Sequence, residues 1–405
     1  MQEKQVKPNF EFIALMASLM SIVALTIDAL LPAIAEIGVS INSVDPTDNQ
    51  LLIIMIFLGL GVGQLFFGPL SDSYGRKPVV YLGFVLFAFA SILCILAPSL
   101  KWMVVGRILQ GIALSAPRTV SISIIRDTYS GDYMARVMSF VTAFFILIPV
   151  IAPAIGKLIL DSMGWEAIFY MQLFFALLIG VWFWKRQPET LKPAYKVPFS
   201  GAIFLEGTKE IFKHKETVFC TIISGLITGS FLVYLSSAQH VFEDQYGLKE
   251  SFPYIFAGLA IAIGLSTFLN GTLVLRFGMR KLALAALFGF TFIALSYVFL
   301  FLGEANPSIG VLVVFLSCLF FCLGFVWGNL RSIAMEPIGH IAGIGAAITG
   351  FIATLLSIPI SLFVGSFVQD TVAPLFAGLG ICGLIALTLF FVFSYRTSSH
   401  KIPHL

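Results

Sequence analysis

About a dozen long apolar stretches divide this chain, and most approach 20 residues, the length of an α-helix that crosses a bilayer. They cover residues 10–34, 50–70, 79–98, 102–125, 137–160, 165–185, 216–239, 252–275, 281–303, 309–334, 342–366 and 373–395. The stretches are continuously apolar rather than alternating, which excludes a closed β-barrel. Only 11% of the residues are charged and 59% are hydrophobic. We therefore predict an all-α membrane protein with twelve transmembrane helices.

The basic residues set the predicted orientation of these helices. If the N-terminus lies in the cytoplasm, most of the 24 Lys and Arg residues fall in cytoplasmic segments, as the positive-inside rule requires. Both termini are then cytoplasmic. The first apolar stretch is too long for a signal peptide, so we expect it to be retained as a helix. This topology accounts for the uneven distribution of the basic residues, so the net charge of +3 gives no indication of nucleic-acid binding.

The longest polar stretch divides the chain almost in half. We expect an N-terminal six-helix half at 1–185, a cytoplasmic linker at 186–215 with room for a short amphipathic helix, and a C-terminal six-helix half at 216–405. The halves echo each other: "GPLSDSYGRK" begins at Gly68 and "GTLVLRFGMRK" at Gly271, with glycines seven residues apart in both. Parallel repeats of this kind are a transporter architecture, with the substrate site at their interface.

Other kinds of site find little support in the sequence. The five cysteines all lie in apolar stretches, and neither a histidine nor a further cysteine completes a metal set around Cys318 and Cys322. We expect no disulfide, metal or cofactor. The chain also contains no nucleophile and base pair and no filter-like repeat, so an enzyme or a channel is disfavoured.

Several motifs resemble those of a known family. "GPLSDSYGRKP", "GRILQG" from Gly106 and "PVIAPAIG" ending at Gly156 resemble motifs of the major facilitator superfamily, the last one in its proton-coupled exporters. "AMEPIGHIAG", "RDTYSG" and "DALLP" resemble the Bcr/CflA branch of drug:proton antiporters. The resemblance covers essentially the whole chain. It implies a monomeric exporter in the bacterial inner membrane that works by alternating access.

The loop between the second and third helices is a candidate gate. The resemblance implies that its Asp locks the two halves together in the outward-facing state, and that charges at the end of the fourth helix join the network. The residues concerned are Gly68, Asp72, Gly75, Arg76, Arg126 and Asp127. The alternative is a solvated loop that only sets topology, with ordinary charges at the end of a helix.

The fifth predicted helix carries Pro149, Pro153 and Gly156. Prolines remove backbone hydrogen bonds and glycine allows a neighbouring helix to approach closely. The resemblance implies that this bend favours exchange over uniport. Lys157 stands where the family usually has a second glycine, which leaves the packing at that end open.

Asp28 is the only carboxylate well inside an apolar stretch. A buried acid resists ionisation and can bind and release a proton in each transport cycle. The alternative is permanent pairing with an arginine. Arg107, in the motif of the fourth helix, is the expected partner and would tune Asp28 in a proton relay.

Two further arginines lie inside apolar stretches. Arg118 follows Arg107 by eleven residues and shares its helix face. Arg331 is its repeat-mate, because "GIALSAPRTV" aligns with "GFVWGNLRSI". Two cations in an apolar cavity are costly unless an anion neutralises them, which favours an anionic substrate. Alternatively, Arg331 snorkels to the interface or pairs with Glu336. Further candidates for substrate contact are Asn329, Asn270, Gln239 and Ser236.

These features predict a proton-coupled secondary active exporter, an antiporter of small organic compounds or drugs, which can also handle an anionic substrate. The alternative is a dedicated exporter or carrier of an organic anion, such as a carboxylated metabolite or a siderophore. The expected partners are the small-molecule substrate, protons and the lipid bilayer.

Overall fold

The chain folds into helices that form two compact units, Met1–Ser200 (unit 1) and Gly201–Leu405 (unit 2). The computed structural model describes residues 9–43, 46–129, 131–193, 196, 198–301, 303 and 305–399. The boundary between the units falls inside the polar stretch that we predicted to be a linker.

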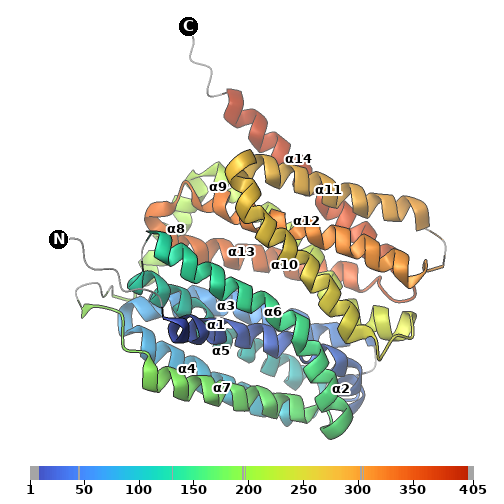
Figure 1. Cartoon of the computed structure of the whole chain (residues 1–405), viewed down its shortest axis with the longest axis horizontal. Helices are drawn as coiled ribbons and strands as arrows, with labels where there is room; N and C mark the ends of the chain where they lie inside the picture. The colour runs from blue at the N-terminus through green and yellow to red at the C-terminus, as the bar shows by residue number, and fades with distance from the viewer. Residues whose placement is uncertain are drawn as a thin grey trace. The chain divides into compact units, whose positions relative to one another are not determined.

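Unit 1 is a bundle of long helices with a break near its beginning (Figure 1). Its elements are α1 (Phe10–Asp28), the 3₁₀ helix η1 (Leu31–Ala33), α2 (Ile34–Ser40), the 3₁₀ helix η2 (Pro46–Gln50), α3 (Leu51–Tyr74), α4 (Arg76–Ile95), α5 (Leu100–Thr128), α6 (Gly131–Met163) and α7 (Glu166–Arg186). Helix α5 packs against α3 and α4, and α1 packs against α6.

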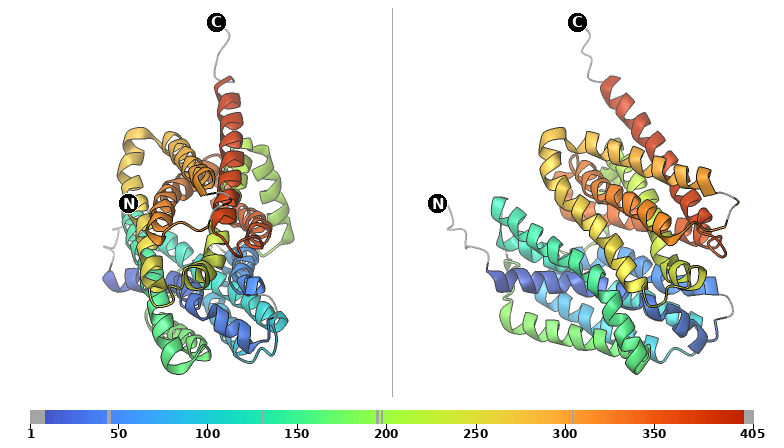
Figure 2. Two further views of the ribbon diagram at one scale, coloured as in Figure 1. Left: turned by 90° about the vertical axis from the view of Figure 1, so that its right-hand side faces the viewer. Right: turned by 45° about the vertical axis from the view of Figure 1, so that its right-hand side comes forward.

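Unit 2 is a second bundle, seen in two further views in Figure 2. Its elements are α8 (Gly201–Lys213), α9 (Lys215–Gln239), the π-helix η4 (His240–Gln245), α10 (Phe252–Phe277), α11 (Met279–Phe301), α12 (Ile309–Met335), the 3₁₀ helix η5 (Gly339–Ile341), α13 (Ala342–Gly365) and α14 (Ala373–Ser399). Helix α12 packs against α9, α10 and α11, and α9 also packs against α13 and α14.

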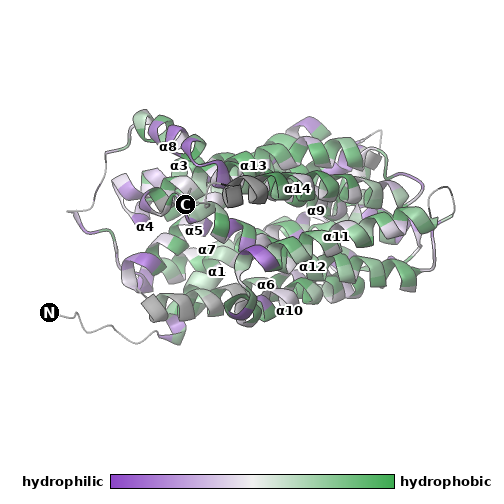
Figure 3. Cartoon of the chain, turned by 90° about the horizontal axis from the view of Figure 1, so that it is seen from above, coloured by the Kyte–Doolittle hydropathy of each residue, from purple (hydrophilic) through white to green (hydrophobic). Residues whose placement is uncertain are grey.

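The described residues include 11 helices that are long and apolar enough to cross a membrane. Apolar residues cover most of their length, whereas hydrophilic residues gather on α8 (Figure 3). Each of the twelve predicted stretches coincides with helical structure, and 137–160 lies in α6, which is not among those 11. The number of twelve membrane crossings and the cytoplasmic position of both termini therefore remain predictions.

The first predicted helix is not continuous, which corrects our expectation for residues 10–34. Helix α1 ends at Asp28, and the short helix η1 begins at Leu31 with Pro32 as its second residue. Proline has no N–H to donate to the preceding turn, and its ring clashes with the carbonyl four residues earlier. The sharp break thus places Asp28 at a helix end and not within a helix.

The predicted amphipathic helix of the linker exists as α8. Its buried residues are Gly207 and Ile211. A side chain at Gly207 would contact Ile344 and Ile348 of α13, so α8 packs on α13 through this face. That α8 lies at a membrane surface remains a prediction.

Two repeat-related glycines mark close helix contacts, one in each unit. A side chain at Gly111 of α5 would collide with the carbonyl of Ile56 and with Gly59 of α3. A side chain at Gly324 of α12 would collide with Ser266 and with the carbonyl of Ile263 of α10. The alignment of the two "G…R" segments thus corresponds to equivalent packing in the two units.

Candidate functional site

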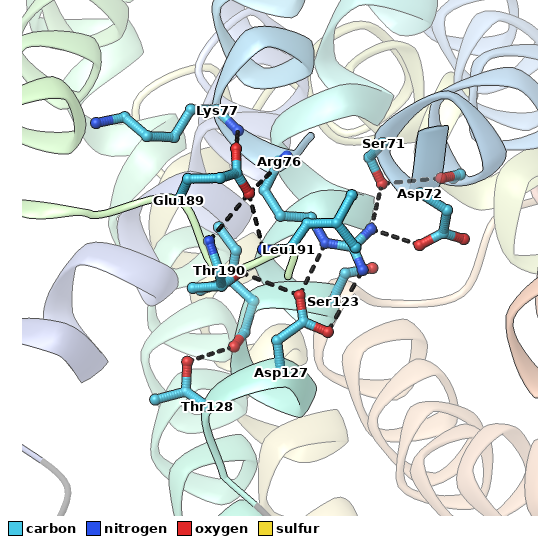
Figure 4. Close-up of polar contacts among 12 residues, drawn as sticks. Ser71, Asp72, Arg76, Lys77, Ser123, Asp127, Thr128, Glu189, Thr190 and Leu191 are labelled. Carbon is cyan, nitrogen blue, oxygen red and sulfur yellow. Dashed lines mark hydrogen bonds and ion pairs between the residues drawn. The ribbon is translucent and has the colours of Figure 1, made fainter. Parts of the chain in front are cut away.

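Arg76 is the buried centre of a polar network at one end of unit 1 (Figure 4). Its guanidinium, 2% exposed, donates to Asp127 through Nε at 2.8 Å and to Asp72 through Nη1 at 2.5 Å. A further hydrogen bond of 2.8 Å runs from Nη1 to the hydroxyl of Ser71. Bonds from a guanidinium to carboxylates are among the strongest in proteins, and they tie together the ends of α3, α4 and α5.

Glu189 extends this network from the segment after α7 (Figure 4). Its carboxylate accepts hydrogen bonds of 3.0 Å from the backbone N–H groups of Arg76 and Lys77, and so caps the start of α4. It also accepts from the N–H groups of Thr190 and Leu191 at 2.9 Å. Partial burial acts to raise the pKa of Glu189, but the four N–H donors outweigh it and hold the pKa below its ordinary value.

Thr190 joins the two parts of the network, because its hydroxyl donates to Asp127 at 3.0 Å. We name the whole set the Arg76 network; its members are Ser71, Asp72, Arg76, Asp127, Glu189 and Thr190. The turn itself depends on Gly75, whose φ of 114° disfavours any residue with a side chain. Gly68 lies inside α3 and has only ordinary contact space beside Thr119, so the reversal does not require it. Arg126 is exposed and has no contact with the network among the described residues.

Asp28 is buried, 5% exposed, where α1 breaks. Within the described part of the chain its carboxyl group makes no ion pair and no hydrogen bond, which differs from the predicted pair with Arg107. The surrounding chain is tightly packed, because a side chain at Gly156 of α6 would collide with the carbonyl of Ala29. Gln172 of α7 lies nearby and donates to the carbonyl of Thr26 at 3.5 Å.

Arg107 is fully buried and has other partners. Its Nε donates to the carbonyl of Leu52 on α3, and its Nη1 donates to the amide oxygen of Gln110, both at 2.8 Å. Gln110 in turn donates to Ser91 of α4 at 2.8 Å. The side chain thus links α5 to its neighbours α3 and α4.

The predicted motif of the fifth helix lies in α6. Pro149 and Pro153 are both inside this helix. Gly156 is buried against Ala29, so α6 packs tightly onto the break in α1. Lys157 does not prevent this approach. Its side chain extends along α6, where its ammonium group forms an ion pair with Asp161 one turn further along.

The two repeat-related arginines differ in exposure. Arg118 is partly buried on α5, whereas Arg331 is exposed on α12. The alternative pairing of Arg331 with Glu336 is not formed in the described structure. The positions of the two arginines relative to each other stay a prediction.

The four polar residues of unit 2 that we predicted to contact substrate make separate hydrogen bonds. Asn329 of α12 donates to Asn270 of α10 at 2.7 Å. Gln239 donates to Glu243 in the π-helix at 2.8 Å. The hydroxyl of Ser236 donates to a backbone carbonyl of its own helix at 3.1 Å. These four predicted residues therefore do not gather into one cluster.

Sequence reasoning missed several members of these sites. Glu189 and Thr190 lie in the linker, where "PET" gave only a local turn signal. The partners of Arg107 were missed because a backbone carbonyl leaves no trace in the sequence. A cluster of aromatic rings in unit 2 was missed because 41 phenylalanines offer no basis for singling out a few.

Two units of long apolar helices, with a polar network at a glycine turn, define a polytopic membrane protein, and the comparisons with known proteins give its family. The family model of the Major Facilitator Superfamily matches residues 13–354, so the chain belongs to that superfamily. A solved structure with a similar fold is the partially occluded, inward-open xylose transporter XylE from E. coli. Its TM-score is 0.71 at 14% identity, over 95% of this chain and 98% of that one.

Two relatives indicate which transporters within the superfamily this chain is similar to. The bicyclomycin resistance protein homolog of Haemophilus influenzae is 28% identical over 399 residues, which is 97% of this chain and 98% of that protein. The multidrug resistance protein MdtL of Shewanella sp. (strain ANA-3) is 27% identical over 370 residues, 89% of this chain and 92% of its own. The predicted resemblance to drug transporters of this superfamily is confirmed. The chain is a multi-pass membrane transporter related to multidrug efflux proteins, which agrees with the prediction that it is not an enzyme.

Proposed function

We propose that this protein is a proton-coupled antiporter that exports small organic compounds across the bacterial inner membrane by alternating access. The observation that carries the proposal is Asp28, a buried carboxyl group at a break in α1 with no ion-pair partner among the described residues. The relation of this chain to multidrug efflux proteins supports export as the direction of transport.

Asp28 is suited to proton exchange because of where it lies. A carboxylate held by an arginine would stay charged throughout the cycle. Asp28 has no such partner, so burial favours the protonated group and access to water favours its release. At the break the regular α-helical pattern of hydrogen bonds gives way to shorter-range bonds, such as that from Leu30 N–H to the carbonyl of Ile27, so this is where we expect α1 to bend during the transport cycle. Gly156 holds α6 against the same segment and would transmit such a change.

The Arg76 network has the role of a cytoplasmic gate in this proposal. Its Asp72 is bound to Arg76 and is part-exposed, with a side-chain exposure of 39%, so it can exchange one partner for another as the transporter changes state. The remaining members are held by several bonds each and would form the fixed side of the gate.

The test uses purified protein in proteoliposomes with a trapped pH-sensitive dye. A neutral probe, naphthalene-2-sulfonamide, or its anionic counterpart, naphthalene-2-sulfonate, is placed on one side. We expect the wild type to move protons when either probe is transported. Asp28→Asn should abolish the proton signal, because an amide cannot release a proton at these pH values.

The matched control is Glu36→Gln, which removes an exposed carboxylate eight residues further along the chain. It should leave the proton signal unchanged. An undiminished proton signal from Asp28→Asn would overturn the assignment of Asp28.

A second candidate function is transport restricted to organic anions. Arg331 favours it, since this exposed guanidinium on α12 has no ion-pair partner among the described residues and suits an anionic group. The same assay separates the two candidates: a general exporter moves the sulfonamide as well as the sulfonate, and a dedicated anion carrier moves only the sulfonate.

A further inference from the structure

Five aromatic side chains around the contact of α9 and α12 belong to a larger connected group of rings in unit 2, and we name these five the α9/α12 aromatic cluster. Its members are Phe231, Tyr234, Phe256, Phe320 and Trp327. The ring centres of Tyr234 and Phe320 are 4.7 Å apart, and those of Phe231 and Trp327 are 5.0 Å apart, both nearly edge to face. Such contacts fix the rings in place, so the cluster is a rigid surface.

The cluster has a buried back and an accessible front. Tyr234, Phe256 and Phe320 are buried, whereas Phe231 and Trp327 are partly exposed. The neighbour of Trp327 is Gly328, which is exposed and carries no side chain that could cover the indole. A planar ring could therefore stack against the front pair without displacing any side chain of α12 next to it.

Trp327 also carries an unused hydrogen-bond donor. Its Nε1 is buried and has no hydrogen-bond partner among the described residues. A buried donor without an acceptor is costly and uncommon, so it calls for a partner from outside the helix. The neighbouring ring of Phe231 supplies only a weak acceptor, and an oxygen atom would bind the N–H more strongly.

A cation lies one turn away on the same helix. Arg331 follows Trp327 by four residues, and side chains four apart share one face of a helix. Arg331 is exposed and makes no ion pair in the part of unit 2 that is described. The same face thus offers an aromatic surface, a single N–H donor and a guanidinium within one turn.

We propose that Phe231, Trp327 and Arg331 form a binding subsite for a planar aromatic compound that carries an anionic group. The ring of the compound stacks on one of the two perpendicular rings of Phe231 and Trp327 and meets the edge of the other, and its anionic group binds Arg331. A turn of the indole upon binding exposes the buried Trp327 Nε1 to an oxygen of the compound. This proposal rests on the proposed transport function and gives its substrate an aromatic, anionic class. Unit 1 lacks such a subsite, because the repeat-mate of Trp327 is Leu114, which is fully buried.

The test measures equilibrium binding of three probes to the purified full-length protein in detergent. The probes are naphthalene-2-sulfonate, its saturated counterpart decahydronaphthalene-2-sulfonate, and the neutral naphthalene-2-sulfonamide. We expect wild type to prefer the aromatic sulfonate over the saturated one by about three- to tenfold. Trp327→Leu, which introduces the residue found at the matching position of unit 1, should remove this preference. Trp327→Phe should keep most of the preference for the aromatic sulfonate, and it should lower the affinity for both sulfonates because the N–H donor is lost.

Two further variants assign the remaining parts. Arg331→Gln should weaken both sulfonates about equally and leave the sulfonamide nearly unchanged, which a purely structural arginine would not do. Phe288→Leu, a change to an exposed ring of α11, is the control and should alter nothing.

The subsite is overturned if wild type binds none of the probes, or if Trp327→Leu retains the full aromatic preference. Binding needs no proton movement, so this result is independent of the Asp28 experiment. If Asp28→Asn still moves protons while Trp327→Leu loses the aromatic preference, proton coupling through Asp28 fails and the subsite stands.

Discussion

The turn at Gly75 in unit 1 and the turn at Gly278 in unit 2 share one backbone form but differ in their side chains. Both glycines have positive φ, 114° and 80°, and each is followed by the start of a long helix. The repeat therefore preserves a reversal that only glycine makes without strain.

The chemistry around the two turns is different. Where unit 1 has Asp72 and Arg76, the aligned residues of unit 2 are Leu275 and Met279. Leu275 is 89% exposed, so it takes part in no packing comparable to that of Asp72. The ion pair near the second turn joins Arg280 to Glu216 on the surface. The two turns thus share a backbone form, but among the described residues only the turn of unit 1 carries a network around a buried arginine, which is why we assign the gate to unit 1.

The largest expected effect comes from giving each turn the residue that follows the glycine in the other turn, Arg76 in unit 1 and Met279 in unit 2. Arg76→Met gives unit 1 the residue of unit 2 and should destabilise the protein by roughly 3–5 kcal/mol, because it leaves Asp127 without its cation. The reverse change, Met279→Arg, should alter the free energy of unfolding by less than about 0.5 kcal/mol, since Met279 is partly exposed and a long arginine side chain can extend from there into solvent. Thermal unfolding of both variants in detergent measures the effect. Equal losses would show that the two turns have the same energetic role.

Gly111 and Gly324, the repeat-related glycines at helix contacts, allow a second comparison of the two units, with a smaller expected effect on stability. Gly111→Ala should cost about 1–3 kcal/mol, because the new methyl group meets the backbone of α3, which cannot yield. Gly324→Ala should cost less, since the nearest atom is the Ser266 hydroxyl, which can rotate away, and the nearest backbone atom, the carbonyl oxygen of Ile263, would lie 2.7 Å from the new methyl group, farther than the Ile56 carbonyl oxygen would lie from the methyl group at Gly111. Unfolding midpoints of the two variants against wild type test the order. A greater loss at Gly324 would mean that α10 and α12 are the more rigid pair.

The sequence allowed the helices to be predicted because bilayer thickness imposes a length and a composition on each span. It also revealed the repeat, since glycines at turns and close approaches leave a recognisable spacing. The predicted contact between Asp28 and Arg107 is not formed for a physical reason. Arg107 binds the carbonyl of Leu52, and a backbone acceptor has no sequence signature.

The other differences also arise from tertiary structure. Glu189 reaches the N-terminus of α4 only because α7 returns the chain to that end of unit 1. Arg118 and Arg331 stand in aligned segments, yet one is partly buried and the other exposed. Alignment defines the helix position of a side chain, whereas the neighbouring helices decide its exposure.

The smallest expected effect concerns Glu189, which caps α4 in unit 1 and has no counterpart in the described contacts at the turn of unit 2. Because the pKa of Glu189 is lower in the folded protein than in the unfolded chain, its stabilising effect is complete above the unfolded value, about 4.3. That effect is lost as the pH falls through the folded value. Glu189→Gln should therefore lower the unfolding midpoint at neutral pH, and the difference from wild type should shrink in acid. Glu206→Gln, which removes an exposed carboxylate of α8, is the control and should show no such trend. A difference between wild type and Glu189→Gln that stays constant from neutral pH to acid would mean that the charge of Glu189 contributes nothing to the cap.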